Sequence, residues 1–264
     1  MKYTREMDFI KRTIREAYRR YYDRSTISSE KKSRFDIVTN IDKSIENLVI
    51  NEIHRLYPND RIISEEYHWR SDIQGRTWTI DPIDGTSNMA NNIPLYGIQC
   101  ALIENNTIVL SLIFLPRLRE MFTAIDNRGV YMNGKRVRVI ERDQMNAVVS
   151  FGDFSHKNLD AAKMEHETMI SLSKKVAKIR MFGSAAIDLA YVAAGKSDGA
   201  VILTKNLWDI APGILLCREA GALVANLLGQ PHRFGDSGLV VAANQRILDD
   251  IIGSIPKGVS LLHT

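Results

Sequence analysis

The sequence has few cysteines and no long apolar stretch, and both shortages narrow the class of protein. Cys100 and Cys217 lie far apart and lack the Cys-x-x-Cys spacing, so we expect neither a disulfide framework nor a thiolate zinc site. The longest uncharged run, residues 85–103, contains asparagine, glutamine and proline, whose polar groups a bilayer cannot satisfy. The first residues lack the apolar segment of a secretory signal. We therefore expect a cytoplasmic protein with no membrane contact.

Most of the chain has no large net charge of either sign. Residues 1–34 carry eleven Lys or Arg against five Asp or Glu, whereas the remaining residues are close to neutral. Apolar residues at Met7, Ile10, Ile14 and Tyr18 recur at helical spacing, which predicts a helix with one apolar face and basic residues in water. Such a charged face is usually just solvated, so no nucleic-acid partner is expected.

The composition is that of an ordinary globular protein. The chain has 264 residues, of which 45% are hydrophobic and 25% charged, which excludes fibrous and disordered classes. We find no internal repeat and no linker rich in Pro, Gly or Ser. The rhythm of the pattern changes near residue 145, so we expect a single domain, 1–264, with two halves of about 1–145 and 146–264 that share an interface.

Periodicity and turn residues predict the elements of both halves. In the first half, a second helix is predicted over 41–56 and stops at Pro58. Asn133-Gly134 is a two-residue hairpin turn that joins two of the strands that follow. This part is predicted to form an antiparallel sheet, with strands at 61–63, 78–80, 98–103, 108–115, 120–125, 130–131 and 136–139. In the second half strands and helices alternate, with strands at 147–151, 199–203 and 238–242 and helices at 159–176, 184–194, 209–220 and 245–252.

The most informative stretch is residues 78–88, Trp-Thr-Ile-Asp-Pro-Ile-Asp-Gly-Thr-Ser-Asn. A strand that ends in this turn can aim Asp81, Asp84 and the Ile83 carbonyl at one point, an all-oxygen arrangement suited to Mg²⁺. The residues after Asp84 can open a helix whose free N–H groups favour phosphate oxygens. An isolated Asp-x-x-Asp more often only caps a turn, so the other acids decide the interpretation.

Further acids stand at the ends of predicted elements. Glu65 follows a strand, and Asp42 and Asp209 stand at the starts of helices. Asp42 or Asp209 taken alone is usually a helix cap or a first-turn acid. Five acids at element ends together predict a metal site, because buried carboxylates without cations are costly.

These motifs together resemble the inositol monophosphatase family, the Mg²⁺-dependent, lithium-sensitive phosphomonoesterases, over nearly the whole chain. The residues that carry the resemblance are DIVTNID at 36–42, SEE at 64–66, WTIDPIDGTSN at 78–88, GSAA at 183–186 and LWDIAPG at 207–213. The resemblance implies a layered αβαβα sandwich of the inositol monophosphatase and fructose-1,6-bisphosphatase type, a mixed α/β or α+β fold that is usually a homodimer.

The resemblance also implies roles for individual residues. The side chains of Glu65, Asp81, Asp84 and Asp209 and the Ile83 carbonyl would hold Mg²⁺, two to three ions per site. Asp42 would lie near a third, weakly held ion and take part in catalysis. The substrate would contact Asp84, Gly85, Thr86, Gly183, Ser184, Ala185 and Asp209.

The expected reaction is the attack of a water on phosphorus without a covalent phosphoenzyme. Glu65 and the Thr86 hydroxyl would orient this water and help to deprotonate it. A nucleophilic thiol is not expected, because both cysteines fall in apolar segments. The six histidines show no zinc-binding spacing.

The sequence leaves the substrate, a small phosphorylated metabolite, open. Animal inositol-cleaving members carry a Glu seven residues before the Asp of the WD motif, and here that position is Ile202. Arg180 and Lys205 could instead meet a second phosphate, although such basic residues more often lie free on the surface. Fructose bisphosphate, phosphoadenosine phosphate, NADP and histidinol phosphate stay open. A remote alternative is a non-catalytic binding module that uses the basic N-terminal helix.

Overall fold

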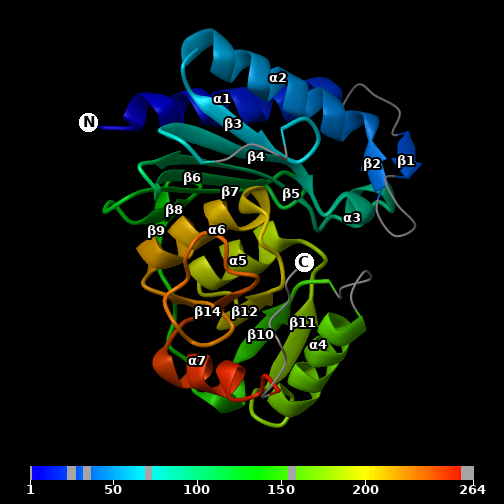
Figure 1. The fold of residues 1–264 in the computed structure, drawn as a ribbon, viewed down its shortest axis with the longest axis vertical. Helices are drawn as coiled ribbons and strands as arrows, with labels where there is room; N and C mark the ends of the chain where they lie inside the picture. The colour runs from blue at the N-terminus through cyan, green and yellow to red at the C-terminus, as the bar shows by residue number, and fades with distance from the viewer. Residues whose placement is uncertain (1, 23–27, 32–36, 69–72, 154–158, 257–264) are drawn as a thin grey trace.

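The computed structural model describes residues 2–22, 28–31, 37–68, 73–153 and 159–256. It is a mixed α/β sandwich of five layers: two helices, a sheet, two helices, a second sheet and two outer helices (Figure 1). This is the layered architecture that the sequence predicts. Within the described residues, no helix has both the length and the apolar character needed to cross a membrane. Asp36 of the first motif lies outside the described residues.

The first layer consists of α1 (Thr4–Tyr21) and α2 (Asn40–Leu56). The predicted apolar stripe of α1 is confirmed, because Met7, Ile10 and Ile14 are buried against α2 and the sheet below. A short antiparallel pair, β1 (Ser29–Lys31) with β2 (Ile37–Thr39), precedes α2. This pair is missing from the sequence prediction, since strands of three residues leave little periodic signal.

A seven-stranded sheet forms the second layer. All its neighbouring strands are antiparallel except β3 and β4, which are parallel. The hairpin at Asn133-Gly134 is confirmed: both residues have positive φ, as a turn of this type requires. In spatial order the strands are β3 (Arg61–Ser64), β4 (Arg76–Asp84), β5 (Gly97–Glu104), β6 (Thr107–Leu115), β7 (Glu120–Ile125), β8 (Val130–Met132) and β9 (Lys135–Val137).

The central layer consists of α5 (Ala185–Ala193) and α6 (Leu207–Ala220), which pack against each other and fill the space between the two sheets. Gly213 allows this close approach, because a Cβ there would lie 2.2 Å from the side chain of Leu189. Ser184 caps α5 by accepting a hydrogen bond from the Ile187 N–H at 3.3 Å, as predicted. The first turns of α5 and α6 point toward the ends of strands in the first sheet.

A five-stranded sheet follows, in the order β11 (Lys178–Met181), β10 (Val148–Phe151), β12 (Gly199–Ile202), β14 (Leu239–Ala242) and β13 (Leu223–Ala225). Strands β11, β10 and β12 are parallel, and β14 and β13 run antiparallel to their neighbours. The sequence prediction misses the two edge strands. Both are short and partly exposed, so neither carries a continuous apolar run.

The last layer holds α4 (Leu159–Leu172) and α7 (Gln245–Ile252). The sequence predicts that the helix starting at residue 159 reaches Val176, and this is wrong. The backbone N–H groups of Lys175 and Val176 both bond to the Leu172 carbonyl, so the chain leaves the helix in tight turns. The short helix α3 (Thr86–Ala90) follows β4 directly and is the expected helix after the Asp84 turn.

Candidate active site

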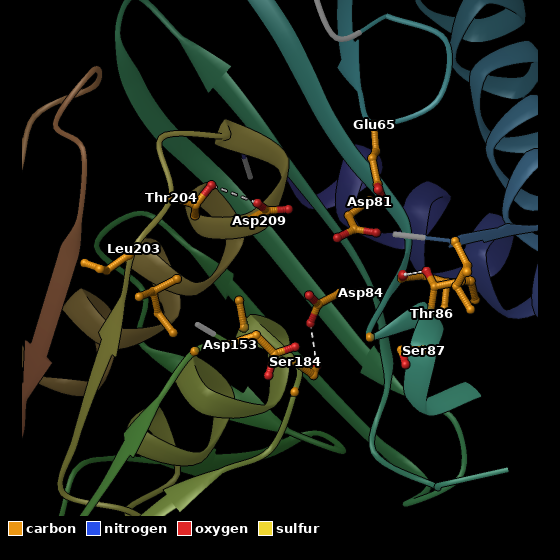
Figure 2. A pocket seen from close by; sticks show the side chains of 17 residues that line it. Glu65, Asp81, Asp84, Thr86, Ser87, Asp153, Ser184, Leu203, Thr204 and Asp209 are labelled. Carbon is orange, nitrogen blue, oxygen red and sulfur yellow. Dashed lines mark hydrogen bonds between the residues drawn. The ribbon is translucent and has the colours of Figure 1, made fainter. Parts of the chain in front are cut away.

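A pocket of about 330 Å³ lies where the ends of β3, β4, β10 and β12 approach the first turns of α3, α5 and α6 (Figure 2). Every residue that the sequence predicts for the site lines this pocket, except Asp42. The seventeen lining residues are Ile37, Glu65, Asp81, Ile83, Asp84, Gly85, Thr86, Ser87, Gly152, Asp153, Gly183, Ser184, Ala185, Ile202, Leu203, Thr204 and Asp209.

A bulge in β4 puts Asp81 and Asp84 on the same side of the sheet. Asp81 pairs with Gln99 and Asp84 with Gly97, so three steps along β4 match two steps along β5. Residues three apart in a regular strand face opposite sides, and one extra residue reverses this. Pro82 lies within the bulge, where its missing N–H costs no ladder hydrogen bond.

Asp81 is a strongly perturbed acid of the pocket. Its side chain is buried, and its Oδ1 atom has no hydrogen-bond partner. Burial, and then the negative charges of Glu65, Asp84, Asp209 and Asp42, raise its pKa well above the usual value. In Figure 2 the side chains of Glu65 and Asp81 point toward each other. A buried, unpartnered carboxylate oxygen among other acids fits a site for a divalent cation.

Asp209 faces the same pocket from the first turn of α6. Thr204 Oγ1 and Asn206 Nδ2 each donate to its Oδ2 atom at 3.1 Å. Burial, followed by the charges of Glu65 and Asp84, nevertheless raises the pKa of Asp209 to about 8. The prediction that a helix-start acid belongs to the acidic cluster therefore agrees with where the structure places it.

The start of α5 binds Asp84 across the interface between the two sheets. The Ser184 hydroxyl and the Ala186 N–H, the latter at 2.7 Å, both donate to Asp84 Oδ2. The pKa of Asp84 is raised to about 6, because burial and, to a smaller extent, the charge of Asp153 outweigh these hydrogen bonds, which lower it. Donors that the resemblance assigns to the substrate are thus already used in part by a carboxylate.

Asp42 lies behind the pocket and acts in two ways. It closes a capping box at the start of α2, because its Oδ2 accepts hydrogen bonds from the Thr39 N–H and hydroxyl. Its Oδ1 lies 2.9 Å from Thr86 Oγ1, which is also 2.9 Å from the Ile83 carbonyl oxygen. Both partners accept only, so they fix the direction of the Thr86 hydroxyl proton.

The carboxylates line one pocket, but the described side chains are not arranged as a complete coordination shell for a metal ion. Among the residues that the structure describes, no group of three or more Asp, Glu, His or Cys side chains is arranged to hold a metal ion. Asp84 is hydrogen-bonded to the start of α5 and Asp209 to Asn206 just before α6, so separate segments hold the two carboxylates. The roles of Glu65, Asp81, Ile83, Asp84 and Asp209 as metal ligands stay a prediction.

Gly85 allows the chain to turn tightly beside these acids. It has φ +89°, and an added Cβ would lie 3.0 Å from the Leu95 carbonyl oxygen and 3.1 Å from that of Gly183. Asn88 secures the turn, because its Nδ2 atom donates to the Phe182 and Leu95 carbonyls at 2.7 Å. The N–H groups at the start of α3 have no acceptor within the helix, as an anion site requires.

Sequence reasoning missed two polar residues at this site. Asp153 follows β10 directly, and the rule that singled out acids at strand ends would have found it. Gln99 is fully buried in β5, and its Nε2 donates to the Asp209 carbonyl at 3.1 Å. The feature of the sequence that could have identified Gln99 is a single amide within an otherwise apolar strand. Neither Arg180 nor Lys205 lines the pocket.

The two cysteines take no part in this arrangement. Cys100 and Cys217 are fully buried, and burial raises the pKa of both thiols far above the usual value. The prediction that they are inert structural residues agrees with these surroundings.

Comparison with known proteins agrees with the family resemblance of the sequence motifs. The sequence model of the Inositol monophosphatase family matches residues 5–259. The chain is 37% identical over 244 residues to the Nus factor SuhB of Pasteurella multocida, which covers 91% of this chain and 90% of that one. It is 36% identical over 206 residues to a fructose-1,6-bisphosphatase/inositol-1-monophosphatase of Thermotoga maritima, or 76% of each chain.

The fold has a close counterpart among solved structures. The extragenic suppressor protein suhB of Bartonella henselae superimposes with a TM-score of 0.86 at 29% identity. The match covers 97% of this chain and 100% of that one.

Proposed function

Because the chain belongs to the inositol monophosphatase family, we propose that it hydrolyses small phosphate monoesters in a reaction that depends on Mg²⁺. The observation that carries this proposal is the pocket itself. Four carboxylates from three separate parts of the chain, Glu65, Asp81, Asp84 and Asp209, line it beside a glycine turn with free N–H groups.

The donor set fits Mg²⁺. All the candidate ligands are oxygen atoms, which hard cations prefer, and Asp81 Oδ1 is buried without a partner. Glu65, Asp81, Asp84, Asp209 and the Ile83 carbonyl would hold two ions, with Asp42 near a third. When bound, the cations supply Lewis-acid chemistry: they stabilise charge on the phosphoryl oxygens and make water easier to deprotonate.

Thr86 and Glu65 act on the attacking water. The Thr86 hydroxyl proton is directed at Asp42 and Ile83, so the lone pairs of Oγ1 are free to accept a hydrogen bond from water. Glu65 lies on the same wall of the pocket and accepts the proton that the water loses. The N–H groups at the start of α3 hold the phosphate beside them.

The test is release of inorganic phosphate from a panel of esters at fixed Mg²⁺. The panel contains an inositol monophosphate, fructose bisphosphate, phosphoadenosine phosphate, NADP and histidinol phosphate. We expect turnover that requires Mg²⁺, is inhibited by Li⁺ and comes from a homodimer in light scattering. No turnover of any ester, in protein shown to be folded, would contradict the proposal.

A second candidate function rests on the basic face of α1. Lys11, Arg12, Arg15, Arg19 and Arg20 line a shallow groove of about 870 Å³ together with Asp8 and Glu16. Several relatives also carry the name Nus factor SuhB rather than that of an enzyme. The candidate activity is binding of single-stranded nucleic acid by counterion release.

This candidate is tested by substitution rather than deletion, because α1 buries apolar residues in the core. Arg12, Arg15 and Arg19 are exposed, so the triple change to Glu should leave the fold intact. If the face binds nucleic acid, affinity for a labelled single strand falls steeply with salt and is lost in the variant. Equal, weak binding by both proteins would exclude the candidate.

A further inference from the structure

One carboxylate of the pocket stands apart from the acids assigned to the metals. Asp153 lies just after β10, in the second half of the chain, and lines the pocket on the side of Ser184 (Figure 2). Its side chain is exposed, and it makes no hydrogen bond or ion pair with any described residue. An ionised carboxylate with free lone pairs can only accept hydrogen bonds.

None of the described residues that line the pocket is basic, so none of them offsets its negative charge. Among the lining residues that the structure describes there are five carboxylates and no Lys, Arg or His. Four of the five are the predicted metal ligands, which divalent cations would neutralise. Asp153 is the fifth, and its charge is close enough to act on Asp84 and Asp188. Among the lining residues that the structure describes, none is a basic partner for Asp153, so its carboxylate is available to a ligand.

Asp153 also lines the same pocket as Ile202, the position where the sequence lacks an acceptor. Strands β10 and β12 are parallel neighbours, and the Gly152 N–H donates to the Val201 carbonyl at 2.9 Å. Gly152 therefore stands opposite Ile202, and Asp153, one residue farther along, lines the same pocket as Ile202. A carboxylate just beyond the end of β10 therefore shares the pocket with an apolar residue at the end of β12.

We propose that Asp153 is a specificity-determining residue that binds hydrogen-bond donors, hydroxyl or ammonium, on the non-reacting part of the substrate and disfavours a second anionic group there. This inference rests on the proposed phosphatase function. It favours polyol and amino-alcohol monophosphates over bisphosphates. The physical reason is that a second phosphate near Asp153 would meet like charge, with no described basic residue to offset it.

The experiment compares four esters with the wild type and with Asp153→Asn and Asp153→Lys. The esters are phenyl phosphate, which has no donor on its alcohol, a polyol monophosphate, an amino-alcohol monophosphate and a sugar bisphosphate. Asp8→Asn, an exposed change of equal charge on α1, is the matched control. Melting temperatures establish that each variant is folded.

The measured quantity is the ratio of kcat/KM for each ester to that for phenyl phosphate. In Asp153→Asn we expect the ratio for the amino-alcohol ester to fall about tenfold. The ratio for the polyol ester falls less, because the Asn carbonyl still accepts from a hydroxyl. In Asp153→Lys the bisphosphate ratio rises and the amino-alcohol ratio falls. A calorimetric titration with the free amino alcohol should show the same loss of affinity without turnover.

The two possible failures are distinguishable. If phenyl phosphate is not hydrolysed at any Mg²⁺ concentration, the phosphatase function itself is wrong and this inference falls with it. If phenyl phosphate is hydrolysed but every ratio is unchanged in both variants, or matches Asp8→Asn, Asp153 does not select the substrate. A wild type that prefers the bisphosphate would also overturn the inference.

Discussion

The side-chain amide of Gln99 donates a hydrogen bond to the main-chain carbonyl of Asp209 at 3.1 Å and so ties strand β5 to the first turn of helix α6. Gln99 is fully buried and stands opposite Asp81 in the sheet register. Its Oε1 atom has no partner. One side chain therefore lies next to two acids of the pocket that come from opposite halves of the chain.

We predict that Gln99→Leu weakens the site more than the fold. Loss of one hydrogen bond at the start of α6 should raise the Mg²⁺ concentration for half-maximal activity about tenfold, equivalent to about 1.4 kcal/mol. Ser111→Ala is the matched control, because Ser111 bonds the Pro212 carbonyl farther along α6. Equal effects of the two changes would show that Gln99 only stabilises helix packing.

Asp84→Asn should abolish turnover while the protein stays folded. The Asn carbonyl keeps the hydrogen bonds from Ser184 and Ala186, but an amide is a poorer ligand for a hard cation. We expect kcat/KM to fall by about a thousandfold or more, roughly 4 kcal/mol of transition-state stabilisation. The rise in melting temperature with Mg²⁺ should also be lost. Near-normal activity would refute the placement of Asp84 in the site.

Glu65→Gln should separate catalysis from folding. The change keeps the shape of the side chain but removes its ability to accept a proton, so turnover falls strongly at every pH while the melting temperature is retained. Glu66→Gln is the matched control, since Glu66 is the neighbouring acid and does not line the pocket. A similar loss in both variants would mean that the turn, and not Glu65, limits the reaction.

Binding of Mg²⁺ should release protons at pH 7. The pKa of Asp209 is raised to about 8, so this group carries a proton at pH 7 when no cation is present, and the pKa of Asp81 is raised in the same direction. Calorimetry in two buffers of different ionisation enthalpy measures this release, and affinity should increase from pH 6 to 8. Asp209→Asn should release fewer protons. Binding without proton exchange would contradict the electrostatic description of the pocket.

The same shifts predict how stability without cations depends on pH. An acid whose folded-state pKa is raised stabilises the fold at low pH, and this contribution is lost as the pH rises through the folded value. The melting temperature of the metal-free protein should therefore fall between about pH 4 and 8. Mg²⁺ should raise the melting temperature most at the upper end of this range. At a concentration one hundred times its Kd, it should increase the free energy of unfolding by about 2.7 kcal/mol. A melting temperature that rises over this range would contradict the prediction.

Glu46 should give a separate pH effect outside the pocket. This buried residue of α2 accepts hydrogen bonds from the Ser64 hydroxyl at 2.6 Å and from the N–H groups of Glu66 and Tyr67, and burial raises its pKa to about 7. Relative to Glu46→Gln, the wild type should lose on the order of 2 kcal/mol of stability as the pH rises from 4.5 to above 7. Glu52→Gln, farther along the same helix, should show no such loss. Parallel stability curves for wild type and Glu46→Gln would refute the assignment.

The sequence by itself determined the features that depend on neighbouring residues. The hairpin at Asn133-Gly134, the end of α2 before Pro58 and the cap of α5 by Ser184 follow from local backbone chemistry, which acts within a few residues. The same is true of the turn that joins Asp81 to Gly85. The layered fold was implied by the resemblance of these motifs to the inositol monophosphatase family, whereas the order of apolar and polar residues predicted only the individual strands and helices.

Only the tertiary structure decided which distant groups meet. That α5 binds Asp84, that Gln99 holds the carbonyl of Asp209 and that Asp153 and Ile202 line one pocket depend on how two sheets and their central helices pack. The edge strands β11 and β13 likewise exist because of their neighbours, since their own residues carry little apolar signal. Contacts between distant segments depend on the geometry of packing, which residue types and spacing do not encode locally.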